Sequence, residues 1–269
     1  MQLLIGTSGW HYNHWLQKFY PPDIKGYHEL TYHARYFNTV ENNSSFYRIA
    51  SAPTYKTWDR MTPDGYRFSI KLNQNVTHVN RLTLNDETRA DMTTILDGTQ
   101  VLGEKLGAIV VQLPASFRAD LVVLAGFLEY FTAEVRRRPY PFDIAIEFRS
   151  KSWFTEEVYG LLRRYNVALV TSQSSRYPEV RLRTADFAYI RMHGPEKLFA
   201  SEYSVDQLAE LADYIHSISG QVKRTYVYFN NDFFGYALDN AKELMRLCDE
   251  RGMPSKLQGE LDIAGTSST

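Results

Sequence analysis

The chain has 269 residues, 44% of them hydrophobic and 23% charged, and its formal net charge is −1. These values are typical of a soluble globular protein and argue against a generally basic protein that coats nucleic acid. Its only cysteine, Cys248, excludes an intramolecular disulfide and a multi-cysteine zinc site.

Strands and helices are expected to alternate along the chain. Alternating apolar and polar residues predict eight strands, at 3–7, 39–47, 67–73, 107–114, 143–149, 167–172, 187–194 and 225–231. Helical patterns predict seven helices, at 29–37, 53–61, 86–105, 120–136, 156–165, 204–219 and 236–251. Ser204 and Gln207 fit the start of a helix as a capping box. The connection from Gln173 to Asp186 contains Pro178 and no helical pattern, so we expect no full helix there.

This alternation is typical of an α/β protein that forms a single TIM-like (β/α)8 barrel with parallel strands. An open doubly wound sheet is the alternative. It is disfavoured because Gly6 and Gly9, at the end of the first strand, do not form the GxGxxG phosphate-binding pattern. We expect the barrel to span residues 1–251 and residues 252–269 to form a C-terminal extension.

The first residues and the hydropathy of the chain bear on its location. The N-terminal segment is too short and uncharged for a signal peptide, and no apolar run approaches membrane-spanning length. We therefore expect a cytoplasmic protein that does not cross a membrane.

Polar residues recur on one face of the predicted strands, near their C-terminal ends. In the fifth strand, Glu147 and Arg149 alternate with apolar residues. Functional groups of barrels lie at the C-terminal ends of the strands, whereas buried barrel strands are otherwise apolar on both faces. The same alternation of inward and outward side chains, applied to the other strands, predicts a set of inward polar residues: Glu41, Asn43, Lys71, Asn73, Gln112, Glu147, Arg149, Arg191, His193, Tyr228 and Asn230.

Several short strings resemble the YecE-like family, known as domain of unknown function 72. They are GTSGWHYNHW, ENNSSFY, SIKLN with a following THVNRL, QLPASF, AIEFRSKSW, YIRMHG and YFNND, and they occur in the family's order from Gly6 to Ala241. The resemblance implies a TIM-like barrel and supplies no reaction. The chain departs from the family's frequent threonine at Ser45, which keeps the hydroxyl. The resemblance also implies recurring polar positions at Glu41, Asn43, Lys71, His78, Gln112, Glu147, Arg149, Arg191, His193 and Asn231.

Three cations, Lys71, Arg149 and Arg191, end three different strands. Such a cluster suits a small anionic or phosphorylated ligand, because arginine holds phosphate or carboxylate by two parallel bonds. The alternative is that Arg149 pairs with Glu147 and the other cations form structural ion pairs. Aromatic residues of the same rim could stack on a sugar or a base, with core packing as the alternative for individual rings.

We interpret the chain as an enzyme, a hydrolase or an isomerase, that uses metal-independent general acid–base chemistry on an anionic sugar- or nucleotide-like ligand. Arg149 should keep Glu147 ionised as base or nucleophile, whereas Glu41 has no adjacent cation and is expected to be the acid. His193 is expected to transfer protons. The expected substrate-binding residues are Asn43, Lys71, His78, Gln112, Arg149, Trp153, Arg191, Tyr228, Asn230 and Asn231.

Other interpretations of the same residues are less favoured. His78 and His193 with the two glutamates are the usual metal-ligand types, but they lack an HExxH-like spacing and lie near cations, so we expect no cofactor. A structural Glu147–Arg149 pair, with Glu41 capping a loop, is the non-catalytic alternative. The competing class of protein is a non-catalytic or metal-dependent barrel that binds nucleic acid. The sequence leaves the oligomeric state open.

Overall fold

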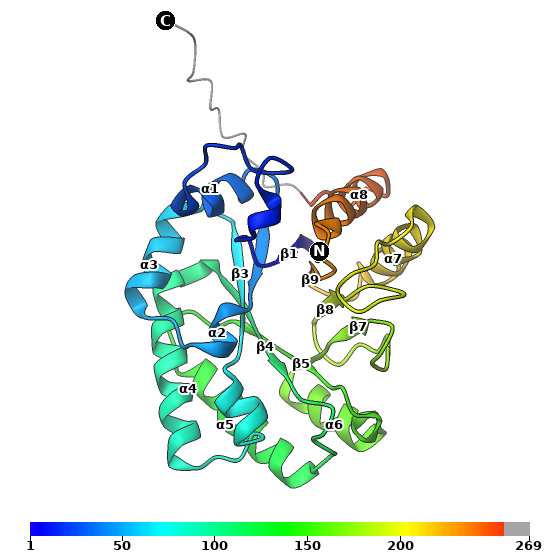
Figure 1. Cartoon of the computed structure of the whole chain (residues 1–269). Helices are drawn as coiled ribbons and strands as arrows, with labels where there is room; N and C mark the ends of the chain where they lie inside the picture. Colours follow the sequence, from blue (N-terminus) through cyan, green and yellow to red (C-terminus); the bar gives the residue numbers. More distant parts are fainter. Residues whose placement is uncertain (256–269) are drawn as a thin grey trace, which may run out of the picture.

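Parallel strands surrounded by helices form a barrel in the computed structural model of the protein, which describes residues 1–255 (Figure 1). All strand pairs are parallel, in the order β6-β5-β4-β3-β2-β1-β9-β8-β7. This order confirms the predicted TIM-like α/β barrel. The strands are β1 (Gln2–Ser8), β2 (Thr39–Asn42), β3 (Arg67–Lys71), β4 (Leu106–Gln112), β5 (Asp143–Glu147), β6 (Ala168–Leu169), β7 (Thr171–Gln173), β8 (Phe187–Met192) and β9 (Arg224–Phe229).

The predicted sixth strand is divided in two, and this division joins the two ends of the sheet. β6 pairs with β5, whereas β7 pairs with β8 on the other side. Only Val170 separates the two segments, and its N–H still donates to the Ile146 carbonyl of β5 at 2.9 Å. One stretch of chain therefore changes partner within a single residue, so the eight predicted strands appear as nine segments.

The helices lie outside the strands, and local capping explains where several of them begin (Figure 1). Asp120 caps one by accepting the N–H groups of Val122 and Val123, and Ser204 with Gln207 forms the predicted capping box. The α-helices are α1 (Glu29–His33), α2 (Ser44–Tyr47), α3 (Ala52–Met61), α4 (Asp86–Thr99), α5 (Leu121–Arg136), α6 (Glu156–Tyr165), α7 (Val205–Ile218) and α8 (Tyr236–Glu250). The short 3-10 or π turns are η1 (Asn13–Trp15), η2 (Gly26–His28), η3 (Asn75–Val79), η4 (Gln100–Lys105) and η5 (Lys151–Trp153).

Side chains at strand ends explain two departures from the predicted elements. The second strand ends at Asn42, because its side-chain oxygen accepts the N–H of Ser45 at 3.1 Å and turns the chain into α2. Asn73 acts in the same way on the N–H of Asn75 at 2.9 Å, so the segment between the predicted third strand and the next predicted helix begins with the π turn η3. The connection 174–186 contains no helix, as predicted.

Alternation along each strand separates two packed layers. In β5, Ile144 and Ile146 face outward into the core shared with the helices, whereas Ala145 faces the barrel interior. The interior is filled mainly by Ala108, Tyr189, Tyr226 and similar residues of the other strands. Full burial of a large apolar side chain contributes roughly 1.5–3 kcal/mol. The interior below the C-terminal ends of the strands is therefore a packed core, and the buried charged residues Glu41, Glu147 and Arg191 lie above it.

The described chain ends just inside the predicted C-terminal extension. Met253 is 8% exposed and packs into the same apolar cluster as α8, and the Ser255 carbonyl accepts a hydrogen bond from Asn38. Residues 256–269, which make up the rest of the predicted extension, lie outside the described residues. Through residue 255, no helix is long and apolar enough to cross a membrane.

Candidate functional site

A buried arginine joins the two carboxylates that the sequence singles out. Arg191 of β8 is 1% exposed, and Glu41 of β2 and Glu147 of β5 have no exposed surface. Arg191 Nη2 lies 2.8 Å from Glu41 Oε1, and Arg191 Nη1 donates to Glu147 Oε2. The inward phase of three strands thus brings together residues that are 150 positions apart in the chain.

Glu41 is held by four donors. Besides Arg191, its oxygens accept bonds from Tyr189 Oη at 2.7 Å, Ser8 Oγ at 2.9 Å and Asn43 Nδ2 at 3.2 Å. Burial opposes ionisation, but the Arg191 charge and these hydrogen bonds outweigh it and hold the pKa of Glu41 below its ordinary value. The expectation that Glu41 has no cation beside it is therefore wrong. The argument for Glu41 as the acid therefore no longer holds, because Arg191 of β8, which is remote in the sequence, supplies a cation beside it.

Glu147 is the carboxylate that contacts both arginines of the network. Arg149 Nε donates to Glu147 Oε1 at 2.8 Å, and His193 Nε2 lies 3.6 Å from Glu147 Oε2. Burial again opposes ionisation, yet the charges of Arg191 and Arg149 and the contact with His193 hold the pKa of Glu147 well below its usual range. The Glu147–Arg149 pair that the sequence suggested as an alternative is present, and Glu147 is ionised at neutral pH.

His193 is a buried, neutral imidazole. Asn230 Nδ2 lies 3.2 Å from His193 Nδ1, and because an amide NH2 group only donates, the ring accepts there and carries its proton on Nε2. Burial is the largest cause that lowers the pKa of His193. Among the described residues, the Nε2 atom has no hydrogen-bond partner. The acceptor Glu147 Oε2 lies 3.6 Å away, just beyond hydrogen-bond distance, so this buried N–H lies beside the carboxylate.

The C-terminal end of the barrel, where the strands end, is called the mouth below. Lys71 and two neutral polar residues line a second side of it. Lys71 Nζ lies 4.0 Å from the centre of the Phe46 ring, and His78 packs edge-on against the same ring at 4.9 Å. His78 Nε2 lies 3.4 Å from Gln112 Nε2. Burial, followed by the charge of Lys71, lowers the pKa of His78 to about 4, so this ring is also neutral at pH 7.

Trp153 and Tyr228 lie away from this polar layer. Trp153 is fully buried outside the barrel, stacked on Phe148 with ring centres 4.8 Å apart, and its Nε1 donates to the Phe117 carbonyl at 2.8 Å. The turn η5 places it there, because it folds back over the outer face of β5. Tyr228 lies inside the barrel, one layer below Glu41, and its hydroxyl bonds Thr39 Oγ1 at 2.6 Å.

Asn231 joins loops instead of facing the carboxylates. Its Nδ2 donates to the Ser201 carbonyl at 3.0 Å and to Asn240 Oδ1 at 2.8 Å, which ties the end of β9 to the loop after β8 and to α8. The structure therefore brings together most of the predicted set, and it separates Trp153, Tyr228 and Asn231 from it.

Sequence reasoning missed two residues of the network and one inward-facing residue beside it. Ser8 and Tyr189 contact Glu41, and Ser172 faces inward opposite Arg191 in the pairing of β7 with β8. Tyr189 lies two positions before Arg191 on one strand face, and this spacing was a usable signal. Ser172 had no such signal, because the strand break beside it is not visible in the sequence.

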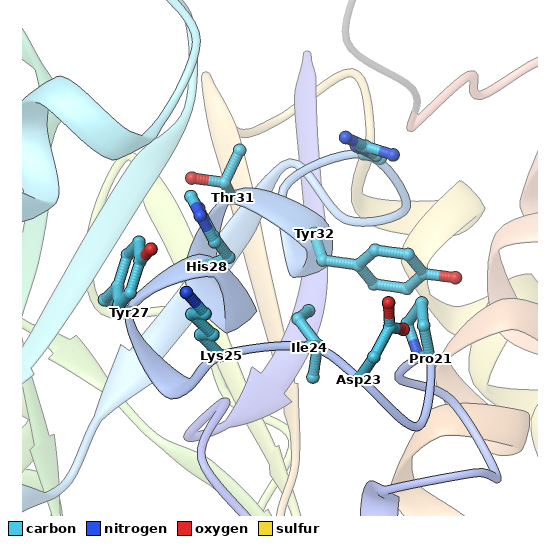
Figure 2. Close-up of a pocket in the computed structure, with 9 residues that line it drawn as sticks. Pro21, Asp23, Ile24, Lys25, Tyr27, His28, Thr31 and Tyr32 are labelled. Carbon is cyan, nitrogen blue, oxygen red and sulfur yellow. The ribbon is translucent and has the colours of Figure 1, made fainter. Parts of the chain in front are cut away.

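A separate surface pocket lies beside α1 and contains none of the predicted site residues. It has a volume of about 460 Å³. Figure 2 shows its lining on the segment before α1 and on α1 itself: Pro21, Asp23, Ile24, Lys25, Tyr27, His28, Thr31 and Tyr32. Arg35, just after α1, also lines the pocket. Over residues 1–255, no group of three or more His, Cys, Asp or Glu side chains is arranged as metal ligands.

Comparisons with known proteins agree with the barrel. A family model described as "Protein of unknown function DUF72" matches residues 4–260. The UPF0759 protein YunF of Bacillus subtilis (strain 168) is 24% identical over 278 residues, which cover 92% of this chain and 95% of that protein. The UPF0759 protein YecE of Escherichia coli (strain K12) is 26% identical over 155 residues, 57% of this chain and 51% of that protein.

Solved structures show the same fold. A DUF72 family protein from Thermotoga maritima MSB8 superposes with a TM-score of 0.79 at 28% identity, covering 93% of this chain and 100% of that chain. A D-psicose 3-epimerase has the same fold at a TM-score of 0.53 and 10% identity, covering 94% of this chain and 97% of that one. The family match over almost the whole length places the chain in the DUF72 family.

Proposed function

We propose that the protein is an enzyme, a hydrolase or an isomerase, that performs general acid–base chemistry on an anionic sugar- or nucleotide-like ligand at the C-terminal end of the barrel. The buried network of Glu41, Arg191 and Glu147 carries this proposal. Desolvating each ion costs several kcal/mol, and an apolar core of the same volume is often as stable. A network that stability does not require, with perturbed pKa values, is typical of a functional site.

The roles follow from the charge states. Glu147 is ionised and is our candidate for the base or the nucleophile, and the His193 Nε2–H, 3.6 Å from Glu147 Oε2, is our candidate proton donor. Glu41 instead positions Arg191, because its oxygens are occupied by four donors. We expect no metal requirement, because both carboxylates are already engaged by arginine side chains.

The ligand is expected to be anionic because the cations of the mouth outnumber its acids. The charge of Arg191 is already paired with the two glutamates, because both of its Nη groups donate to their carboxylates. Arg149, half-buried and stacked at 4.4 Å from the centre of the Tyr177 ring, lies nearer the surface. Arg149, together with Lys71, is therefore the expected contact for a phosphate or carboxylate.

The test is a turnover screen of sugar phosphates, nucleotides and phosphorylated aryl glycosides, with product formation measured by mass spectrometry. Once a substrate turns over, Glu147→Gln should lower kcat by about 10²-fold or more, since general acid–base groups contribute that much. The matched control is Glu179→Gln, which removes an exposed carboxylate paired only with Arg181. Full turnover by Glu147→Gln would contradict the proposed role.

Nucleic-acid binding is the second candidate function, and the charge distribution favours it. Four loops at the C-terminal ends of β2 to β5, residues 43–51, 72–85, 113–119 and 148–155, contain no Asp or Glu. They carry five cations, in a chain whose net charge is −1: Arg48, Arg81, Arg118, Arg149 and Lys151. An exposed ring, Tyr47, lies on the first of these loops with 73% of its surface accessible. Cations with aromatic rings suit the backbone and bases of a single strand.

Salt dependence tests this second function. Binding of a fluorescent single-stranded oligonucleotide should weaken with salt, and neutralising Arg81 and Lys151 should reduce the log–log slope by about 0.7 for each phosphate that the protein no longer neutralises. Arg136→Gln with Arg137→Gln, at the end of α5 on the opposite side of the barrel, is the matched control. Equal slopes for the two double variants would exclude a nucleic-acid surface on these loops.

A further inference from the structure

Lys71 differs from Arg149 and Arg191 in having no carboxylate partner among residues 1–255. Arg191 is held by two carboxylates and Arg149 by Glu147. The Lys71 amine lies against the face of Phe46, and within the described part of the chain no hydrogen bond or ion pair engages it. Lys71 ends β3 and remains half-buried. Its amine is thus free to meet an incoming group at the mouth.

The surroundings of Lys71 favour an uncharged amine. Burial, followed by the charge of Arg191, lowers the pKa of Lys71 to about 7, although Glu147 opposes this shift. A larger share of Lys71 amines is therefore unprotonated at neutral pH than of exposed lysines, whose pKa lies near 10.4. A desolvated lysine beside another cation is a recognised form of activated nucleophile.

We propose that Lys71 is the nucleophile of this site and that the ligand carries an aldehyde or ketone carbonyl beside its anionic group. A sugar phosphate in its open-chain form and a 2-oxo acid both have this chemistry. The inference rests on the proposed function, because it names the substrate class and the covalent step of the same site. Arg149 would hold the anion, and Lys71 would meet the carbonyl.

The covalent step balances without an oxidant or a reductant. The nitrogen lone pair of Lys71 attacks the carbonyl carbon, and one of the two amine protons moves to the carbonyl oxygen to give a carbinolamine. The hydroxyl group then leaves as water with the second amine proton, and the resulting C=N nitrogen takes up a proton from solvent to become an iminium ion. The face of Phe46 lies 4.0 Å from Nζ and can stabilise this cation. The iminium ion acidifies the neighbouring C–H bond, whose proton the ionised Glu147 could accept.

Reductive trapping tests the inference without requiring turnover. The full-length chain is incubated with pyridoxal 5′-phosphate, which carries both an aldehyde and a phosphate, or with the smaller aldehyde acid glyoxylate. Borohydride then reduces any imine, and peptide mass spectrometry locates it. With either probe, Lys71 should be labelled about 10-fold faster at pH 7 than the exposed Lys56 and Lys151, with a half-maximal rate near the pH set by its lowered pKa.

Two variants separate this inference from the proposed function. Lys71→Arg places a permanently charged guanidinium there and should lose the adduct while still binding inorganic phosphate, with an affinity measured by calorimetry that is no weaker than that of the wild type. Glu147→Gln should keep the adduct. Labelling of Lys71 no faster than Lys56 and Lys151, or labelling that rises only above about pH 9, would overturn the inference. Glu147-dependent turnover of a substrate that has no carbonyl would still support the proposed function and would exclude the imine step.

Discussion

Removal of the Arg191 guanidinium should be among the most damaging single changes in the barrel. Arg191→Met keeps much of the side-chain volume but leaves Glu41 and Glu147 buried without the cation they share. Removing one partner of a buried ion pair costs about 3–5 kcal/mol. Glu147 keeps Arg149, whereas Glu41 keeps only neutral donors. We therefore expect a loss of about 3–5 kcal/mol in the free energy of unfolding at pH 7, with Glu41 responsible for most of it.

The loss should depend on pH, and its sign follows from the pKa shifts. In the wild type, the pKa values of Glu41 and Glu147 lie below their unfolded values, so their stabilisation is present above the unfolded pKa and is lost as pH falls through the folded pKa. In Arg191→Met, burial without the cation should raise the pKa of Glu41 above its unfolded value. Protonation then relieves the buried charge, so the difference between variant and wild type should shrink as the pH is lowered from 7 to about 5.

Urea unfolding followed by circular dichroism measures the stability loss and its dependence on pH, provided that the slope m is the same for the wild type and Arg191→Met. Arg60→Met, at an exposed arginine of α3, is the matched control and should change stability by less than about 0.5 kcal/mol. A loss below about 1 kcal/mol, or a loss that is unchanged between the two pH values, would show that the buried network is not electrostatically coupled as described.

Three further outcomes are expected from the same site. Glu41→Gln should lower kcat less than Glu147→Gln does, because Glu41 positions Arg191 without acting on the ligand; equal losses in single-turnover assays would restore a direct role for Glu41. Trp153→Phe removes the bond to the Phe117 carbonyl and should cost about 1 kcal/mol of stability with kcat within about twofold, measured by thermal unfolding and turnover. Dialysis against a chelator should leave the rate within about twofold, and a loss that added divalent metal reverses would contradict the proposed metal independence.

Local alternation was sufficient to predict which side chains face the barrel interior. Side chains of a strand point to opposite faces in turn, so one apolar stripe such as that of β5 places Glu147 on the other face. The same rule placed Glu41 and Arg191 inside the barrel. Because the strands are parallel, their C-terminal ends share one end of the barrel, and the predicted polar set had to gather there.

Distances across the barrel could not be predicted in this way. Whether a residue of β8 reaches one of β2 depends on strand register, on barrel closure through the divided β6–β7 stretch and on side-chain length. The position of Trp153 depends likewise on how η5 folds back after the strand, which the run of aromatic residues does not reveal.

The sequence by itself determined the fold class, the facing of each strand and the chemical types at the mouth, because these follow from neighbours two to four positions apart. The tertiary structure alone decided the charge states of Glu41 and Lys71. The charge of Arg191 lowers the pKa of Glu41, and burial together with the charge of Arg191 lowers the pKa of Lys71. The physical reason is that a pKa depends on desolvation and on charges a few ångströms away, and both are set by residues that are remote in the chain.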